Sequence, residues 1–285
     1  MRPGGIGVVS LTIADVSRNH DIPGSAGAVR ADGGPGRPAG GGEAGLAPGP
    51  DGKVASVANQ QEALSAAAEA GIRGVIIDWG GVLTNSIRET VAAWAEAEGV
   101  DWKSYVAVMR PWLEDFYHAD AVGNPVHALE RGECAVEEFE EMFAARLVRV
   151  DGGPVSADGL LARMFGASLT VPAMYDMLRA LRAAGFRTCL LSNSWGPGGY
   201  QRDDFPELFD AVVISSEVGM RKPERRIFLH AAGLLGLEPR ECVFVDDIEA
   251  NVTAAVACGM AGVRHEDPKL TAEHLTALLG VTLGK

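Results

Sequence analysis

The chain has 285 residues, of which 47% are hydrophobic, and carries a formal net charge of -13. This length and apolar content suffice for one large domain or two modest ones. The negative charge argues against binding to nucleic acid or to an anionic membrane surface, because both attract Lys and Arg. No apolar stretch approaches the length of a membrane span, and the short apolar run over 6–13 is flanked or broken by glycines, unlike a signal peptide. We therefore expect a soluble cytoplasmic protein that binds neither nucleic acid nor membrane.

The cysteines support the same location. None of the four belongs to a Cys-x-x-Cys pair, so they predict neither a zinc site nor a disulfide framework. We expect all of them to be buried, reduced thiols: Cys134, Cys189, Cys242 and Cys258.

The first segment, residues 1–53, is dominated by Gly, Ala and Pro. It lacks the large apolar side chains that would offset chain entropy, so we expect a disordered leader without a functional site. Whether this segment belongs to the native protein or reflects an over-long gene start stays open. Residues 59–70 are compatible with a short helix that leads into the first strand.

The first predicted strand ends in an acid. Val75 to Ile77 form a short apolar run, and Asp78 follows it directly, ahead of Gly80 and Gly81. A carboxylate that acts as a nucleophile toward phosphorus needs a rigid strand end and an open backbone turn beside it. Asp78 with the two glycines meets both requirements.

After Thr84 the sequence shows helical patterns for about a hundred residues, and we predict a helical insertion over 86–168. Its signals are a capping box of Ser86 with Glu89, a helix end at Gly99, a helix from Asp101 limited by Pro111, and a helix start at Asn124-Pro125. The segment 135–147 is strongly amphipathic, and its stripe of Phe139, Met142 and Phe143 is more typical of a core than of a ligand pocket.

After the insertion, helices and short apolar runs alternate. The runs 189–191, 211–214 and 242–245 predict three further strands, and helices are expected over 171–184, 223–235, 248–258 and 271–279. This alternation predicts an α/β fold with a doubly wound parallel sheet. The core would comprise 54–85 and 169–285, with the helical segment inserted after the first strand.

Each later strand is also followed by polar residues. Ser192-Asn193 follow the second run, Arg221-Lys222 come after the third, and Asp246-Asp247 end the fourth. Ligands of such sheets bind beyond the carboxyl ends of the strands, so these groups should converge. Any one of them could instead be a helix cap, a turn residue or a solvated side chain. The ordered set of four indicates a phosphoryl-transfer site.

These motifs resemble those of the haloacid dehalogenase superfamily over roughly residues 72–285. The residues that carry the resemblance are Asp78 to Thr84, Leu191-Ser192-Asn193, Gly219 to Pro223, and Val245 to Asn251. Within the superfamily, the chain resembles bacterial sugar-phosphate phosphatases typified by alpha-D-glucose-1-phosphate phosphatase, and the amino-terminal phosphatase domain of soluble epoxide hydrolase. The resemblance implies a Rossmann-like core, a helical cap over the active site, and hydrolysis of a phosphomonoester through an aspartyl-phosphate.

The resemblance also implies the roles of the site residues. Asp78, the Gly80 carbonyl and Asp247 would bind Mg²⁺, with Asp246 in or just outside the first coordination shell; magnesium favours such oxygen ligands. Phosphate would be bound by the Gly80-Gly81 turn, the Ser192 hydroxyl, the Asn193 amide and Lys222, while Arg221 could either line the phosphate pocket or face solvent. Adjacent acids at the end of a buried strand are costly without a cation.

One position departs from the pattern of many phosphatases in the superfamily. They carry a general acid two positions after the nucleophile, where this chain has Gly80. Loss of a general acid lowers a rate by roughly 10²-fold to 10⁴-fold if nothing replaces it. The phosphatase branch named above shares this glycine, so a water or a cap residue could move the proton; His118 and His127 are candidates, although each could equally be a surface or core histidine.

Two other functions stay open. A dehalogenase uses the same aspartate nucleophile without that acid, but its pattern has an aromatic residue at the Gly80 position and needs no acidic metal pair. A catalytically silent domain that binds phosphorylated ligands or a protein partner is disfavoured because Asp78, Ser192, Lys222 and Asp247 all occur together. The expected substrate is a small phosphorylated metabolite, most simply a sugar phosphate, and Trp195 could line the entrance or pack between cap and core. Whether the protein is a monomer or a homodimer stays open.

Overall fold

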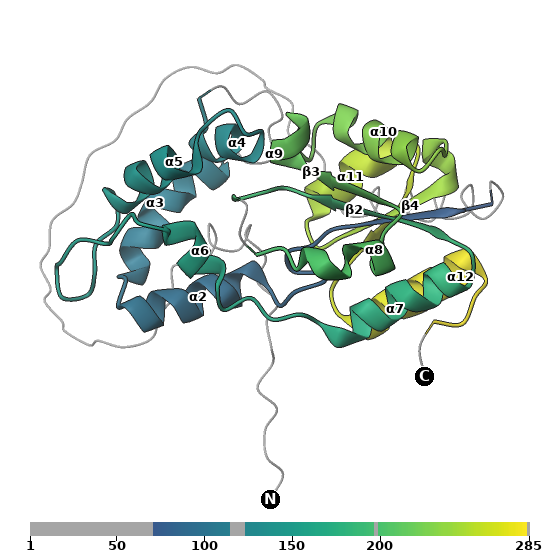
Figure 1. Cartoon of the computed structure of the whole chain (residues 1–285), viewed down its shortest axis with the longest axis horizontal. Coiled ribbons are helices and arrows are strands. Elements are labelled where there is room, and N and C mark those ends of the chain that lie inside the picture. Colours follow the sequence, from purple (N-terminus) through teal and green to yellow (C-terminus); the bar gives the residue numbers. More distant parts are fainter. Residues whose placement is uncertain (1–70, 115–122, 197–198, 284–285) are drawn as a thin grey trace, which may run out of the picture.

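The computed structural model describes residues 71–114, 123–196 and 199–283 (Figure 1). The expected leader over 1–53, the expected helix over 59–70 and His118 lie outside the described residues.

A parallel sheet lies at the centre of the α/β part, in the strand order β3-β2-β1-β4-β5. Its strands are β1 (Gly74–Ile77), β2 (Arg187–Ser192), β3 (Ala211–Ile214), β4 (Cys242–Asp246) and β5 (Ala261–Arg264). β1 and β4 are buried along their whole length, which explains their unbroken apolar sequence. Because the chain winds outward from β1 first to one side and then to the other, the expected doubly wound fold is confirmed.

β5 was not expected from the sequence. Its residues, Ala-Gly-Val-Arg, include only one β-branched side chain, so the strand pattern is weak. Its glycine has a packing role: a Cβ at Gly262 would lie 2.7 Å from Cγ1 of Val252, on a helix that crosses the strand. The tertiary contact, rather than local propensity, explains the residue at this position.

Helices cover both faces of the sheet (Figure 1). α7 (Pro172–Ala183), α8 (Phe205–Leu208) and α12 (Pro268–Leu279) pack on one face, and α10 (Arg225–Leu234) and α11 (Glu249–Ala257) on the other. Short elements connect them: η2 (Arg202–Asp204), α9 (Ser215–Val218) and η3 (Pro239–Glu241). The two faces bury separate apolar clusters, so the sheet is held from both sides.

The other helices form a separate unit beside the sheet, seen at the left of Figure 1. They are α2 (Ile87–Glu98), α3 (Trp102–Glu114), α4 (Pro125–Glu130), α5 (Val136–Ala144) and α6 (Leu160–Phe165). These helices share one apolar cluster, in which Phe139 and Phe143 are fully buried, so the aromatic stripe of α5 belongs to a core as expected. The helical unit lies within the expected cap over 86–168; the division from a core of 54–85 and 169–285 stays a prediction, because residues 54–70 and 284–285 lie outside the described residues.

The local signals at the start of this unit act as the sequence predicted. Ser86 and Glu89 form a reciprocal capping box on α2, and Gly99 ends the helix in a left-handed conformation. The expectation that Pro111 limits the next helix was wrong, since α3 continues to Glu114. Proline removes a single backbone bond, which this helix tolerates at Pro111.

Two further boundaries differ from the expectation. α10 begins at Arg225, two residues after Pro223, which lies in a turn. α12 begins at Pro268 rather than Thr271, because Asp267 accepts hydrogen bonds from the next backbone amides and caps the helix earlier. The cysteine expectation holds except at one position: all four are unpaired, but Cys134 is only half-buried.

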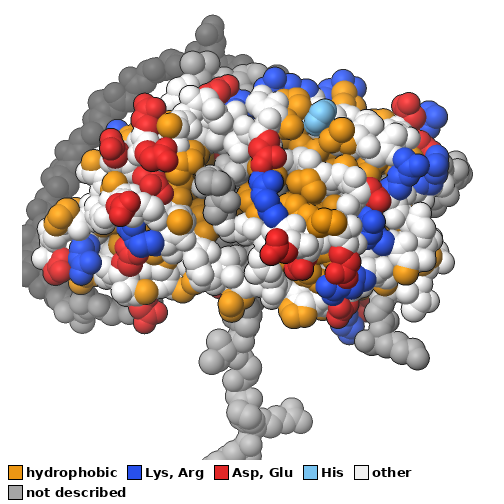
Figure 2. Space-filling view, viewed as in Figure 1, with side chains coloured by type: hydrophobic (Ala, Val, Ile, Leu, Met, Phe, Trp, Pro, Cys, Tyr) orange, Lys and Arg blue, Asp and Glu red, His pale blue; other side chains and the backbone are white. Residues whose placement is uncertain are grey.

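No helix in the described part of the chain combines the length and apolarity needed to cross a bilayer. Figure 2 shows acidic side chains gathered over the helical unit, where Glu137, Glu138 and Glu141 of α5 are exposed. This acidic face is unsuited to binding a polyanion such as nucleic acid.

Candidate active site

The strand register brings three of the expected residues to one edge of the sheet. Ile77 of β1 pairs with Leu190 of β2 on one side and with Val245 of β4 on the other. The residues that follow, Asp78 and Asp246, are therefore neighbours, and Ser192 lies at the end of β2 beside them. This edge is the point where the strand order reverses, the usual ligand site of doubly wound sheets.

Lys222 lies between two of the carboxylates. Its Nζ is 2.8 Å from Oδ1 of Asp78 and 2.7 Å from Oδ2 of Asp246, and the side chain is 1% exposed. Burial alone lowers the pKa of Lys222, but the two carboxylates outweigh it and raise that pKa above its ordinary value. The ammonium therefore stays charged and offsets part of the negative charge of the acids.

Three carboxylates meet at this edge, because oxygens of Asp78, Asp246 and Asp247 all lie within 4.8 Å of one another. Burial and the charge of Asp246, only partly offset by Lys222, raise the pKa of Asp78 to about 7. The pKa of Asp247 also lies well above its ordinary value, through burial first and then the two neighbouring acids. The cluster thus carries more negative charge than one lysine balances.

The individual oxygens have different partners. Both oxygens of Asp246 accept hydrogen bonds, from Lys222, from the Ile248 amide at 2.8 Å and from the Asn251 side chain. Oδ1 of Asp247, in contrast, is buried without a hydrogen-bond partner among the described residues. An all-oxygen cluster with one buried, unpartnered carboxylate oxygen fits the preferences of Mg²⁺.

The glycine turn after β1 allows Asp247 to approach. Gly81 has φ of +76°, and a Cβ at this position would lie 2.5 Å from Oδ2 of Asp247. Glycine is therefore needed at Gly81 both for its backbone conformation and for space. Gly80, the expected carbonyl ligand, lines the cavity beside Asp78.

Asp78 is held in a fixed orientation. Its Oδ1 accepts hydrogen bonds from the Trp79 amide at 2.7 Å and from Lys222, and neither contact involves Oδ2. Ser192 Oγ lies 3.0 Å from the hydroxyl of Tyr200, a half-buried residue whose ring packs against Trp79. Burial raises the pKa of Tyr200 to about 12, so the phenol stays protonated near neutral pH.

The side chain of Asn193 binds the backbone of Lys222. Its Oδ1 accepts from the Lys222 amide at 2.8 Å, and its Nδ2 donates to the Lys222 carbonyl at 3.0 Å. The carboxamide therefore pairs with both backbone groups of Lys222 and positions the lysine. The backbone amide of Asn193 keeps its proposed role toward phosphate.

Arg221 lies elsewhere than expected. It is 0% exposed, which rules out a solvent-facing arginine, and its Nε donates to Oε2 of Glu130 at 2.5 Å. It does not line the cavity, so we omit it from the proposed phosphate contacts. Its neighbour in the sequence, Lys222, points toward the carboxylates instead.

Glu130, at the end of α4, connects the helical unit to the core. Its carboxylate also accepts hydrogen bonds from Asn193 at 3.3 Å and from the Trp195 indole at 3.1 Å. Burial raises the pKa of Glu130, although Arg221 opposes that shift. Sequence reasoning missed both Glu130 and Tyr200, because no motif marks them and their partners are distant in the chain.

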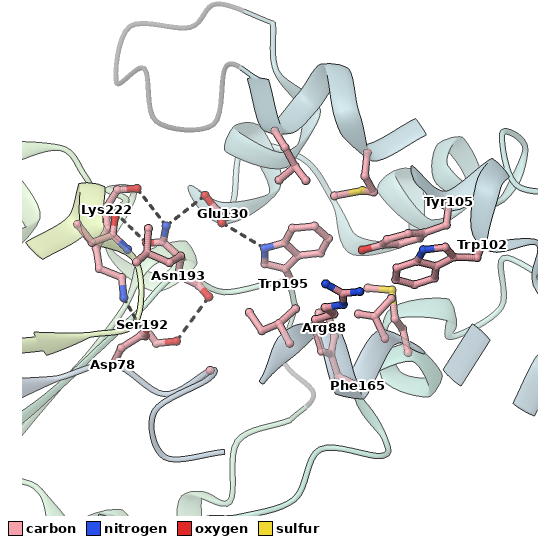
Figure 3. Close-up of a pocket in the computed structure, with 18 residues that line it drawn as sticks. Asp78, Arg88, Trp102, Tyr105, Glu130, Phe165, Ser192, Asn193, Trp195 and Lys222 are labelled. Atoms are coloured by element: carbon pink, nitrogen blue, oxygen red, sulfur yellow. Dashed lines mark hydrogen bonds and ion pairs between the residues drawn. The ribbon is translucent and has the colours of Figure 1, made fainter. Parts of the chain in front are cut away.

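A cavity that is partly open to solvent lies between the sheet edge and the helical unit. Figure 3 shows Asp78, Ser192, Asn193 and Lys222 on one side of it and Trp195 facing Tyr105 and Trp102 on the other. Trp195 both lines the cavity and packs against Phe165, so the two expected roles coincide. His127 is fully buried and is not among the lining residues, which removes it as a proton donor.

The fold and the acidic edge define a hydrolase with an aspartate at the end of its first strand. A family model for haloacid dehalogenase-like hydrolases matches residues 72–259. The chain belongs to the haloacid dehalogenase-like hydrolase family, as the sequence motifs indicated.

Two curated proteins illustrate the similarity of this chain to known proteins. Bifunctional epoxide hydrolase 2 of Sus scrofa is 26% identical over 74% of this chain and 40% of its own length. Sesquiterpene phosphatase astK of Aspergillus oryzae is 33% identical over 38% of this chain and 56% of its own length. The chain thus spans less than two thirds of each of these two relatives.

A solved structure shares the fold. The haloacid dehalogenase-family enzyme of Bacteroides thetaiotaomicron in complex with magnesium and inorganic phosphate superposes with a TM-score of 0.51 at 22% identity, over 69% of this chain and 95% of that one.

Proposed function

We propose that the chain is a Mg²⁺-dependent phosphomonoesterase that acts through an aspartyl-phosphate on Asp78. The observation that carries the proposal is the joint placement of Asp78, Lys222, Asp246 and Asp247 at one sheet edge, open to a cavity. Asp78, Asp247 and the Gly80 carbonyl would hold the ion, with Asp246 beside them. The bound ion would supply positive charge that lowers the repulsion between the carboxylates and a phosphate dianion.

We assign the roles of the residues in the reaction as follows. The Ser192 hydroxyl, the Asn193 amide and Lys222 would bind phosphate oxygens and orient the phosphorus in line with Oδ2 of Asp78. Attack by Oδ2 would form the acyl phosphate as the bond to the leaving oxygen breaks. Hydrolysis by water would then release phosphate and restore the carboxylate of Asp78.

The leaving oxygen needs a proton, and Gly80 offers none. The acidic side chains that line the cavity in the described part of the chain are Asp78 and Glu130. Glu130 is committed to Arg221, Trp195 and Asn193, so it is not placed as a free acid. We therefore infer that water delivers this proton.

The substrate would be a small phosphorylated metabolite. The sugar-phosphate expectation rests on resemblance alone, whereas the A. oryzae relative, a phosphatase by name, supports the reaction class. Dehalogenation is less well supported, because Gly80 stands where that chemistry has an aromatic residue and because the acidic cluster would have no use. The unpaired cysteines support the proposed cytoplasmic location.

Phosphate release from a panel of phosphomonoesters, with and without Mg²⁺, tests the proposal beside the variant Asp78→Asn. We expect Mg²⁺-dependent release that Asp78→Asn abolishes, since an amide does not attack phosphorus, while the circular dichroism spectrum stays that of the parent. Undiminished turnover in Asp78→Asn would refute the nucleophile assignment.

A further inference from the structure

The cavity has a polar end and an apolar end. The polar end is formed by Asp78, Ser192, Asn193 and Lys222 at the sheet edge. Beyond them the wall is built by apolar side chains of the helical unit, chief among them Val91, Trp102, Tyr105, Met109, Met164 and Phe165. A phosphate bound at Asp78 would therefore direct its leaving group against the apolar wall (Figure 3).

Two of the polar groups on that wall, the Glu130 carboxylate and the Trp195 indole N–H, already have partners. The carboxylate of Glu130 accepts from Arg221, Asn193 and Trp195. These bonds also use the indole N–H of Trp195. Among the described residues this leaves Arg88, the Tyr105 hydroxyl and the Trp102 indole N–H as the polar groups beyond the phosphate end.

A sugar leaving group would lose solvation here. Each of its hydroxyls exchanges bonds to water for bonds to the protein, and an unpaired buried hydroxyl costs free energy. Arg88 and Trp102 offer only donors, so among the described residues the Tyr105 oxygen is the one side-chain acceptor left on this wall for the several hydroxyls of a hexose. The aromatic pair of Trp102 and Tyr105, stacked at 5.0 Å between ring centroids, instead presents apolar surface.

An adjoining cavity offers few further partners. Several of its polar groups are already bonded: Thr84 Oγ1 donates to the Asn85 carbonyl at 3.1 Å, and Thr90 Oγ1 lies 3.2 Å from Asn85 Oδ1. Asn85 Oδ1 accepts a further bond, 2.8 Å long, from the Leu169 amide. These bonds hold the first turn of α2 in place, and they leave only the Ser168 hydroxyl and the Asn85 amide nitrogen, among the described residues around Asn85, as added partners for sugar hydroxyls.

We propose that the substrate is a phosphomonoester of an apolar alcohol, aliphatic or aromatic, whose hydrocarbon part binds against the wall formed by α2, α3 and α6. This inference rests on the proposed phosphatase function and specifies its leaving group. Water would attack the acyl phosphate after the alcohol has left, and the alcohol takes up one proton from water, so the reaction yields alcohol and phosphate. The apolar wall selects the substrate by removing its hydrocarbon surface from water.

The first experiment compares kcat/KM, with Mg²⁺ present, for butyl, hexyl and octyl phosphate, 1-naphthyl phosphate and the two glucose monophosphates. We expect kcat/KM to rise about threefold to fourfold for each added methylene until the cavity is filled. Hexyl phosphate should exceed both glucose phosphates by at least about tenfold, as the rise per methylene implies. Glucose phosphates turned over as well as hexyl phosphate would overturn the apolar leaving group and leave the phosphatase intact.

Absence of phosphate release from every compound would instead overturn the phosphatase function itself. A binding measurement then tests the apolar preference independently of the phosphatase function. Calorimetry with the Asp78→Asn variant should show that octyl phosphate binds more tightly than glucose 1-phosphate. Equal binding of the two would count against the apolar wall without reference to turnover.

A matched pair of variants tests whether the preference for apolar substrates arises from the apolar wall. Met109 of α3 is 2% exposed and lines the cavity, whereas Met142 of α5 packs in the same apolar cluster but does not line it. Met109→Gln should lower the ratio of kcat/KM for octyl phosphate over glucose 1-phosphate about tenfold, since a polar group replaces apolar surface. Met142→Gln should leave that ratio unchanged, and an equal fall in both variants would refute the role of the wall.

Discussion

The buried ion pair between Glu130 and Arg221 provides a sharp test of how the helical unit is held on the core. Their side chains are 1% and 0% exposed, and the 2.5 Å contact joins the end of α4 to the segment after α9. The Glu130 carbonyl also accepts from the Ser215 hydroxyl at 2.5 Å. Glu130→Leu removes the carboxylate and, with it, the buried ion pair between Glu130 and the Arg221 guanidinium.

The loss of folding stability expected for Glu130→Leu follows from the burial of both side chains. Breaking a buried ion pair by removing one member destabilises a protein by about 3 to 5 kcal/mol. The double variant Glu130→Leu with Arg221→Met removes both charges, and such apolar replacements are often close to neutral. The Trp195 indole N–H still loses its acceptor, at a cost of about 1 to 3 kcal/mol. The double variant should therefore be more stable than Glu130→Leu.

Urea unfolding followed by tryptophan fluorescence measures these differences, with Trp195 directly beside the pair. An exposed pair serves as control: Arg179 and Glu207 are 43% and 58% exposed, and Glu207→Gln should change the midpoint far less than Glu130→Leu. A loss below about 1 kcal/mol in Glu130→Leu, or a double variant no more stable than the single one, would refute the reasoning.

Two further predictions concern the glycine turn after β1. Gly81→Ala should weaken Mg²⁺ binding, measured by calorimetry in the presence of phosphate, because its Cβ would lie 2.5 Å from Oδ2 of Asp247. The control is Gly185→Ala, since Gly185 also has a positive φ but a Cβ there would have no atom within 4 Å. Equal Mg²⁺ affinities in the two variants would contradict the prediction. Gly80→Asp should fold, since its Cβ would meet only the side chain of Ile87 at 3.3 Å, and should raise kcat by up to about 10²-fold if proton transfer to the leaving oxygen limits turnover. An unchanged or lower kcat would show that proton transfer does not limit the native enzyme.

The sequence by itself determined four of the five strands in the described sheet, and the family. Apolar runs that end in polar residues marked the ends of β1, β2 and β4, because strands buried on both faces require continuous apolar sequence. The capping box of Ser86 and Glu89 and the helix end at Gly99 were also predictable, since both act within a few residues. β5 was missed, because its sequence reflects contact with α11 more than strand propensity.

Only the tertiary structure decided what surrounds the predicted site. Arg221 is adjacent to Lys222 in the chain, yet it binds Glu130, which lies 91 positions away, rather than phosphate. Likewise, the side chains that form the apolar wall come from three helices whose periodic patterns are those of ordinary core residues. Local sequence encodes strands and caps through short-range backbone preferences, whereas pairing of buried charges and the lining of a cavity depend on which distant segments pack together.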